Sequence, residues 1–200
     1  MDWLQTPFNM LVCGRTGCGK TYLILDLLET QFKHTFDNII IFCPTIDFNK
    51  TYQERNIKKN KKMYIAPPKF VQSDLDSALE EAIEQFSSPT EQTLFLIDDC
   101  ANLKKSKAKN SMLCQLAFSG RHHNISTWVL TQKYNAIVKD FRDNIKHLIL
   151  HYEKDEDSLK AALKENRVVP TEKRKDVISQ LDKGKRLFLR IDAPLSYAIF

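Results

Sequence analysis

The stretch GRTGCGKT at residues 14–21 places three of the chain's five glycines within eight residues and ends in a lysine and a threonine. It fits the pattern GxxxxGKT. An apolar run, FNMLVC, precedes it at 8–13, and a helical pattern, TYLILDLLETQF, follows at 21–32. Between a strand and a helix, such a loop turns its main-chain amides toward phosphate oxygens, and the helix N-terminus adds its positive dipole end. The stretch therefore predicts a site for a nucleoside triphosphate.

Two side chains at the end of this loop have chemical roles of their own. Lys20 can reach the β- and γ-phosphates as a point charge, and Thr21 can offer its hydroxyl to Mg²⁺. The other positions expected to contact the nucleotide are Gly14, Arg15, Thr16, Gly17, Cys18, Gly19 and Tyr22. The contact to adenine stays open among Tyr22, Phe8 and the C-terminal segment.

The strand-like runs LFLIDD and WVLTQ end in polar residues that could complete such a site. Asp98 is the expected partner of Mg²⁺, and Asp99 could orient and polarise an attacking water. Asp99 is one methylene shorter than the glutamate usual at that place. Gln132 could form a hydrogen bond with the γ-phosphate or with the attacking water.

Arg121, in SGRHHNIS, is a candidate arginine finger for the nucleotide of a neighbouring subunit. Arg142, in KDFRDNIKH, is the competing candidate. An ordinary surface arginine remains an equally good interpretation of Arg121.

Composition favours one globular domain. The chain has 200 residues, of which 42% are apolar, and no apolar run reaches the roughly 18 residues that cross a bilayer. The first ten residues lack the basic and apolar regions of a signal peptide. Five cysteines in no zinc-ligand spacing indicate reduced thiols. A net charge of +5 permits a polyanionic partner without requiring one.

The elements that must position these residues alternate along the chain. We expect strands at 8–13, 38–44, 93–99, 125–132 and 145–152, and a hairpin of two strands in the tail KRLFLRIDAPLSYAIF that turns at Asp192-Ala-Pro. We expect helices at 21–32, 73–86 with Ser73 as cap, 110–120, 156–166 and 171–184. Apolar strands that alternate with helices predict an α/β fold with a parallel sheet covered on both faces.

These motifs, in this order, resemble those of the packaging ATPases in the FtsK-HerA superfamily of P-loop NTPases. The likeness is greatest to the genome-packaging ATPases of poxviruses and their relatives in other large eukaryotic DNA viruses, virophages and related transposons. It rests on GRTGCGKT, NIIIFCPT, LFLIDDC, SGRHHNIS, WVLTQ and FRDNIKH. The resemblance implies a three-layer, additional-strand, RecA-like domain over 1–200, with an N-terminal arm (1–7), a core (8–152) and C-terminal helices and hairpin (153–200).

The resemblance further implies an ATPase, with ATP and Mg²⁺ as ligands, that translocates double-stranded DNA into a preformed capsid. Such a protein would act as a ring of five or six copies, contact capsid vertex proteins, and work in the host-cell cytoplasm or viral factory, with virion association as a further option. The candidate DNA contacts are Lys104, Lys105, Lys107 and Lys109, and less so KKNKK at 58–62. Ordinary solvated lysine loops remain an alternative for both.

Two other functions stay open on the residues alone. One is another P-loop NTPase, helicase-like or a small-molecule kinase, although no arginine-dense lid segment is present. The other is a nucleotide-gated assembly protein without turnover, which would have no need of Asp99.

Overall fold

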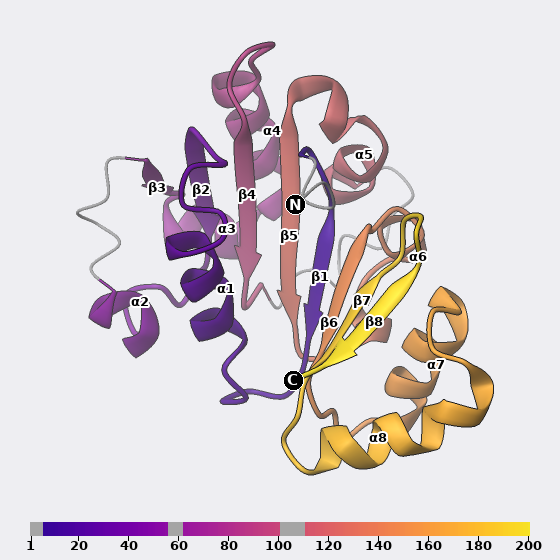
Figure 1. Cartoon of the computed structure of the whole chain (residues 1–200). Coiled ribbons are helices and arrows are strands. Elements are labelled where there is room, and N and C mark those ends of the chain that lie inside the picture. Colours follow the sequence, from indigo (N-terminus) through magenta and orange to yellow (C-terminus); the bar gives the residue numbers. More distant parts are fainter. Residues whose placement is uncertain (1–5, 56–61, 101–110) are drawn as a thin grey trace.

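The strands form one eight-stranded sheet in the order β3-β2-β4-β5-β1-β6-β7-β8, seen in Figure 1. The computed structural model describes residues 6–55, 62–100 and 111–200. The strands are β1 (Met10–Cys13), β2 (Asn38–Phe42), β3 (Met63–Ile65), β4 (Thr93–Asp98), β5 (Ile125–Thr131), β6 (His147–Leu150), β7 (Leu187–Arg190) and β8 (Ser196–Ile199). Strands β1 to β6 pair in parallel, whereas β7 is antiparallel to β6 and β8 to β7. The predicted mostly parallel sheet with a C-terminal hairpin is confirmed.

Strand β5 lies between β1 and β4. Leu11 of β1 is in register with Val129 of β5, and Leu96 of β4 is in register with Trp128. One additional strand therefore separates the strand before GRTGCGKT from the strand that ends in the acids. Because all three run in parallel, their carboxyl ends share the lower edge of the sheet in Figure 1. This is the predicted additional-strand arrangement.

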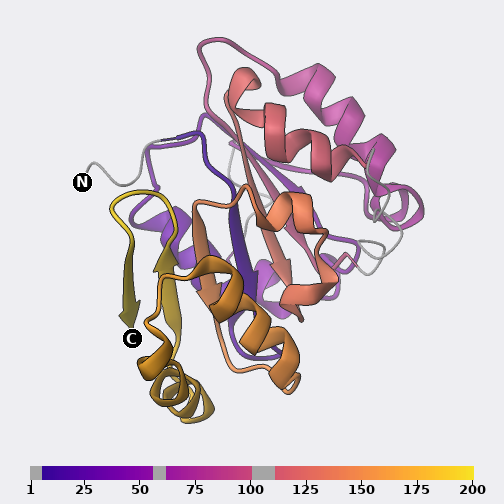
Figure 2. The ribbon, with the colours of Figure 1, turned by 90° about the vertical axis from the view of Figure 1, so that its right-hand side faces the viewer.

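Helices cover both faces of the sheet. They are α1 (Lys20–Glu29), α2 (Lys50–Glu54), α3 (Pro68–Ser73), α4 (Leu75–Phe86), α5 (Met112–Ser119), α6 (Lys139–Arg142), α7 (Glu156–Asn166) and α8 (Arg174–Asp182), with short 3₁₀ turns η4 (Gly120–His123), η5 (Tyr134–Ala136) and η6 (Thr171–Lys173). Side chains alternate along a strand, so Val12 belongs to the core cluster on the side of α1 and α2, and Leu11 belongs to the cluster that includes residues of α3 to α8. Figure 2 shows α4 and α5 on the side of the sheet opposite α1.

The helix predicted at 73–86 is α4, which begins two residues later at Leu75, and its predicted cap, Ser73, is wrong. Ser73 is the last residue of α3, and Asp74 caps α4 by accepting a hydrogen bond from the Ser77 amide at 3.0 Å. Asp74 is favoured as the cap because its extended backbone turns a carboxylate toward the free amides of the first turn. Gly120 follows α5 with helical dihedral angles, and the chain continues through η4 to Asn124 at φ 54°.

No helix in the described part of the chain is long and apolar enough to cross a bilayer.

Candidate functional site

The loop between β1 and α1 can hold its shape only with glycine at particular places. Gly17 and Gly19 lie at φ 77° and 87°, in the left-handed region that other residues rarely adopt. At Gly14 the limit is space, because a Cβ there would lie 2.6 Å from Cβ of His151 and 2.8 Å from Sγ of Cys18. The glycines of GRTGCGKT are thus explained by backbone angle at two positions and by close packing at a third.

The residues after β6 support this loop from the neighbouring strand. The amide of His151 donates to the Cys13 carbonyl at 2.8 Å, and the amide of Arg15 donates to the Tyr152 carbonyl at 3.4 Å. His151 is buried, and burial, with the positive charges of Arg186 and Lys20, lowers its pKa to about 4. A neutral imidazole therefore packs against the loop at physiological pH.

The start of α1 carries a positive potential that no side chain of its own first turn neutralises. Gly19 is the N-cap residue and offers no side-chain cap, and the first turn contains no acidic residue. The Lys20 ammonium donates to the carbonyls of Gly14 at 2.7 Å and Arg15 at 3.1 Å, so it lies against the loop itself. Free amides, a helix dipole and an ammonium group together favour an anion.

Asp98 is joined to the loop by a direct hydrogen bond. The Thr21 hydroxyl donates to Oδ2 of Asp98 at 2.8 Å, and the Tyr52 hydroxyl donates to the same oxygen at 2.9 Å. Asp98 is 4% exposed, and burial raises its pKa although the two hydroxyls and the Lys20 charge oppose the shift. The structure thus brings together a hydroxyl and a carboxylate that the sequence places 77 residues apart.

Asp99 follows the strand in a left-handed conformation at φ 53°. Its Oδ2 accepts a hydrogen bond from the Thr45 hydroxyl at 2.9 Å, and its side chain is exposed. The two successive acids therefore have different surroundings, since Asp98 is buried under two hydroxyls and Asp99 faces solvent. Because of this difference, Asp98 is suited to act as a fixed ligand, and Asp99 is suited to contact a molecule that enters the cavity from solvent.

The loop, both acids and Gln132 line one cavity of about 770 Å³. Its lining residues are Thr16, Gly17, Gly19, Lys20, Thr21, Tyr22, Asn49, Lys50, Thr51, Asp98, Asp99, Cys100, Leu130, Thr131, Gln132, Lys133 and Ala136. Gln132 is exposed, at the end of β5. The volume is in the range of small-molecule and cofactor sites. Parallel strand ends thus bring three separately predicted motifs, GRTGCGKT, LFLIDD and WVLTQ, to one place.

Arg121 does not join this group. It is exposed and precedes β5, whereas Gln132 follows β5. At about 3.3 Å per residue, that strand separates Arg121 from Gln132 by roughly 20 Å or more. Arg121 therefore lies at the sheet edge opposite the cavity of its own chain.

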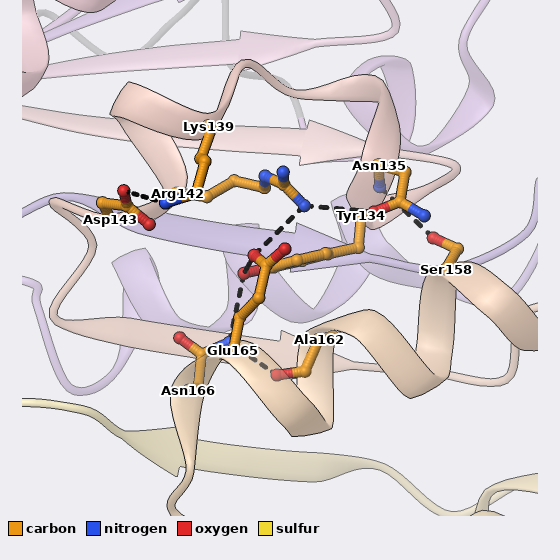
Figure 3. A network of polar contacts seen from close by, with 9 residues as sticks. All are labelled: Tyr134, Asn135, Lys139, Arg142, Asp143, Ser158, Ala162, Glu165 and Asn166. Carbon is orange, nitrogen blue, oxygen red and sulfur yellow. Dashed lines mark hydrogen bonds and ion pairs between the residues drawn. The ribbon is translucent and has the colours of Figure 1, made fainter.

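Arg142 is held in a network within its own chain (Figure 3). Nη1 lies 3.2 Å from Oε2 of Glu165 and donates to Oδ1 of Asn135 at 3.1 Å. Its guanidinium stacks 4.6 Å from the Tyr134 ring centroid, and its side chain is 11% exposed. The hydroxyl of Tyr134 also donates to Glu165, so the network joins α6 and α7 to the turn after Gln132.

Of the three candidates for an adenine contact, the two aromatic residues Phe8 and Tyr22 differ in position. Phe8 is buried against Phe32 and Trp128, in the core. Tyr22 is half-exposed at the cavity, and the Arg55 guanidinium lies 4.6 Å from its ring centroid.

The candidate DNA contacts, the lysines at 104–109 and residues 58–61, lie outside the described residues.

Sequence reasoning missed the residues that hold the two acids. Thr45 follows β2, whose carboxyl end lies at the same sheet edge, so the parallel-strand rule could have located it. Tyr52 and the cavity residues at 49–51 belong to α2 and its cap, an element with no periodic pattern.

The fold and the cavity together define a P-loop NTPase with an additional strand between the phosphate-loop strand and the acid-bearing strand. The family model for the Poxvirus A32 protein matches residues 2–186. The chain belongs to this family, so the resemblance predicted from the motifs is confirmed.

Individual relatives agree with this assignment. The DNA packaging protein OPG160 of Vaccinia virus (strain Copenhagen) is 31% identical over 149 residues, covering 72% of this chain and 53% of that protein. The chain thus spans about half the length of the curated relatives it matches. The genome packaging NTPase B204 from Sulfolobus turreted icosahedral virus 2, in complex with ATP-gammaS, shares the fold at a TM-score of 0.65 and 16% identity, over 96% of this chain and 95% of that one. Its complex with AMPPCP has a TM-score of 0.66 at 13% identity, over 98% of each chain.

Proposed function

We propose that this chain hydrolyses ATP to ADP and phosphate and uses the reaction to package double-stranded DNA into a preformed viral capsid. Membership of the A32 family and the names of its relatives, DNA packaging protein and genome packaging NTPase, support the biological role. The observation that carries the chemistry is the 2.8 Å hydrogen bond from Thr21 to Asp98, which joins the phosphate loop to the acid-bearing strand inside one cavity.

The donor set fits a triphosphate with its magnesium ion. The hydroxyl of Thr21 and the carboxylate of Asp98 are hard oxygen ligands in contact with each other, and they would hold Mg²⁺. When bound, the ion would neutralise charge on the phosphate oxygens. Lys20 would exchange its two carbonyl contacts for the β- and γ-phosphates. The remaining oxygens would be bound by loop amides other than those of Gly14 and Arg15, which already donate to the Thr131 and Tyr152 carbonyls. Tyr52 keeps the Asp98 carboxylate in place.

Hydrolysis needs a water aligned behind the terminal phosphate. Asp99, exposed at the cavity, would accept a hydrogen bond from that water, and Thr45 would fix the carboxylate's orientation. Gln132 would hold the γ-phosphate or the same water. As the water oxygen bonds to the γ-phosphorus, the bond to the β–γ bridging oxygen breaks, and ADP leaves with the bonding electron pair.

In a ring of five or six copies, an arginine of one copy would reach the nucleotide of the next copy and act as its arginine finger. Arg121 lies too far from the cavity of its own chain, so an action on nucleotide requires a neighbouring copy. Arg142 is already paired with Glu165, so Arg121 is the better candidate for the arginine finger. Lys104, Lys105, Lys107 and Lys109 remain the proposed contacts to the DNA backbone, and capsid vertex proteins the proposed partners, in the host-cell cytoplasm or viral factory.

The test is ATP turnover with and without duplex DNA. A packaging motor should hydrolyse ATP faster with duplex DNA, a small-molecule kinase only with a small acceptor, and an assembly protein not at all. Lys20→Ala should abolish turnover. Asp99→Asn should retain ATP binding and lose at least a hundredfold in rate, while Asp182→Asn, which changes an exposed acid on α8, should leave the rate unchanged. A normal rate in Asp99→Asn would remove that acid from its role.

A further inference from the structure

A cation from the C-terminal hairpin lies beside the phosphate loop. Nη2 of Arg186 is 3.5 Å from the position that a Cβ at Gly19 would occupy. The backbone of Arg186 is fixed, because its amide donates to the Phe200 carbonyl at 2.8 Å and its carbonyl accepts from the Phe200 amide at 3.0 Å. The pairing of β7 with β6 and β8 holds the rest of the hairpin. The hairpin thus presents this guanidinium to the N-cap residue of α1.

Arg186 differs from other partly buried arginines because its side chain has no hydrogen bond or ion pair within the described ranges 6–55, 62–100 and 111–200. Four residues along, Arg190 donates to Asp192 at 3.1 Å. Arg142 is paired with Glu165, and Arg55 with Glu29. A partly buried guanidinium retains its five donors and full charge, so it normally finds an acceptor.

The surroundings of Arg186 are also positive. The N-terminus of α1 has no acidic residue in its first turn, and Lys20 follows directly. Burial is the main reason that the pKa of His151 is low, and the positive charges of Arg186 and Lys20 lower it further. A helix N-terminus, an ammonium and an unpaired guanidinium repel one another unless an anion lies among them.

We propose that Arg186 binds a phosphate group of the nucleotide held by residues 14–21, so that the C-terminal hairpin forms part of the nucleotide site. The inference rests on the proposed function, because it requires that the loop binds a phosphate-bearing ligand. The guanidinium donates to phosphate oxygens on the side of Gly19 where the hairpin approaches α1. Nucleotide binding thereby ties the hairpin to the phosphate loop, and the hairpin adds affinity that GRTGCGKT alone does not provide.

The experiment measures dissociation constants for ATP and ADP with Mg²⁺, and for adenosine, by calorimetry. Arg186→Gln and Arg186→Ala should each weaken ATP and ADP binding at least tenfold, and Arg186→Lys should recover part of the loss because it keeps the charge. Lys185→Ala, which removes the same charge from the exposed neighbouring position, should stay within twofold of the unsubstituted chain. Without nucleotide, Arg186→Gln should unfold at the same temperature as the unsubstituted chain or at a higher one, because the substitution removes repulsion at the start of α1.

The outcomes separate the two proposals. If the unsubstituted chain binds ATP and Arg186→Gln binds it within twofold, Arg186 does not contact phosphate, and the proposed function is untouched. An equal loss of affinity in Lys185→Ala would also overturn the inference, because the lower net charge, and not a contact from Arg186, would then explain the weaker binding. If the unsubstituted chain binds no ATP, the proposed function fails and the inference fails with it. If Arg186→Gln weakens adenosine as much as ATP, the contact is not to phosphate.

Discussion

Glu153 is a buried acid next to the phosphate loop, and its substitution should change how stability depends on pH. The residue is 3% exposed, and neither carboxyl oxygen accepts a hydrogen bond of ordinary geometry in the part of the chain that the structure describes. Burial raises its pKa to about 7, against smaller opposing effects of the nearby Ser158 side chain and Tyr134 backbone. Its charge also raises the pKa of Cys13, at the end of β1. An acid under the loop is thus protonated in part at neutral pH.

The sign and size of the effect follow from this shift. Between the ordinary pKa of 4.5 and about 7, the folded chain holds a proton that the unfolded chain has released. The free energy of unfolding therefore falls as pH rises through this window and stays lower above it. At about 1.4 kcal/mol for each tenfold change in proton affinity, the shift costs about 3 kcal/mol of stability at pH 8 to 9.

Glu153→Gln removes the ionisation and keeps the shape of the protonated acid. Denaturant unfolding of both proteins between pH 4.5 and 9 should give a stability difference that grows from near zero to about 3 kcal/mol in favour of the variant. His147 and His151, whose pKa values burial lowers to about 4, act in the opposite direction but are common to both proteins, so they cancel in the difference. A difference that does not change with pH would refute this account of Glu153.

Three further substitutions test separate parts of the site. Tyr52→Phe should lower the free energy of unfolding by about 1–2 kcal/mol, measured in denaturant, because Asp98 loses one of two hydroxyl donors; an unchanged midpoint would contradict the contact. Gly14→Ala should lose about 1–3 kcal/mol, because its Cβ would meet that of His151, and normal stability would mean that the loop is looser than described. Arg121→Ala mixed with the unsubstituted chain should reduce turnover more than in proportion to its share, whereas strictly proportional activity would exclude a role between subunits.

The phosphate loop and the strand ends were predictable because their signals are local. GRTGCGKT requires glycine at defined backbone positions, and apolar runs that end in polar residues mark where parallel strands reach the sheet edge. From these two features alone, Asp98 and Gln132 could be placed near Lys20, and the cavity brings them together. The hairpin at the C-terminus was equally visible, because two apolar runs flank a turn sequence.

The contacts that complete the site were not predictable from pattern. Tyr52 lies in a five-residue helix, too short for a periodic signal, and its partner Asp98 is 46 residues away. The left-handed backbone of Asp99 depends on how the chain leaves β4, which no single residue type dictates. Arg186 gains its significance only from the folding of β7 beside β6, which brings it to Gly19.

The most direct test is a crystal structure of the chain with Mg²⁺ and a non-hydrolysable ATP analogue. The account predicts the triphosphate inside the turn formed by residues 14–21, with the ion between Thr21 and Asp98 and the terminal phosphate facing Asp99. A nucleotide bound elsewhere on the chain, or a loop that leaves the triphosphate outside while Thr21 and Asp98 keep their mutual hydrogen bond, would contradict it.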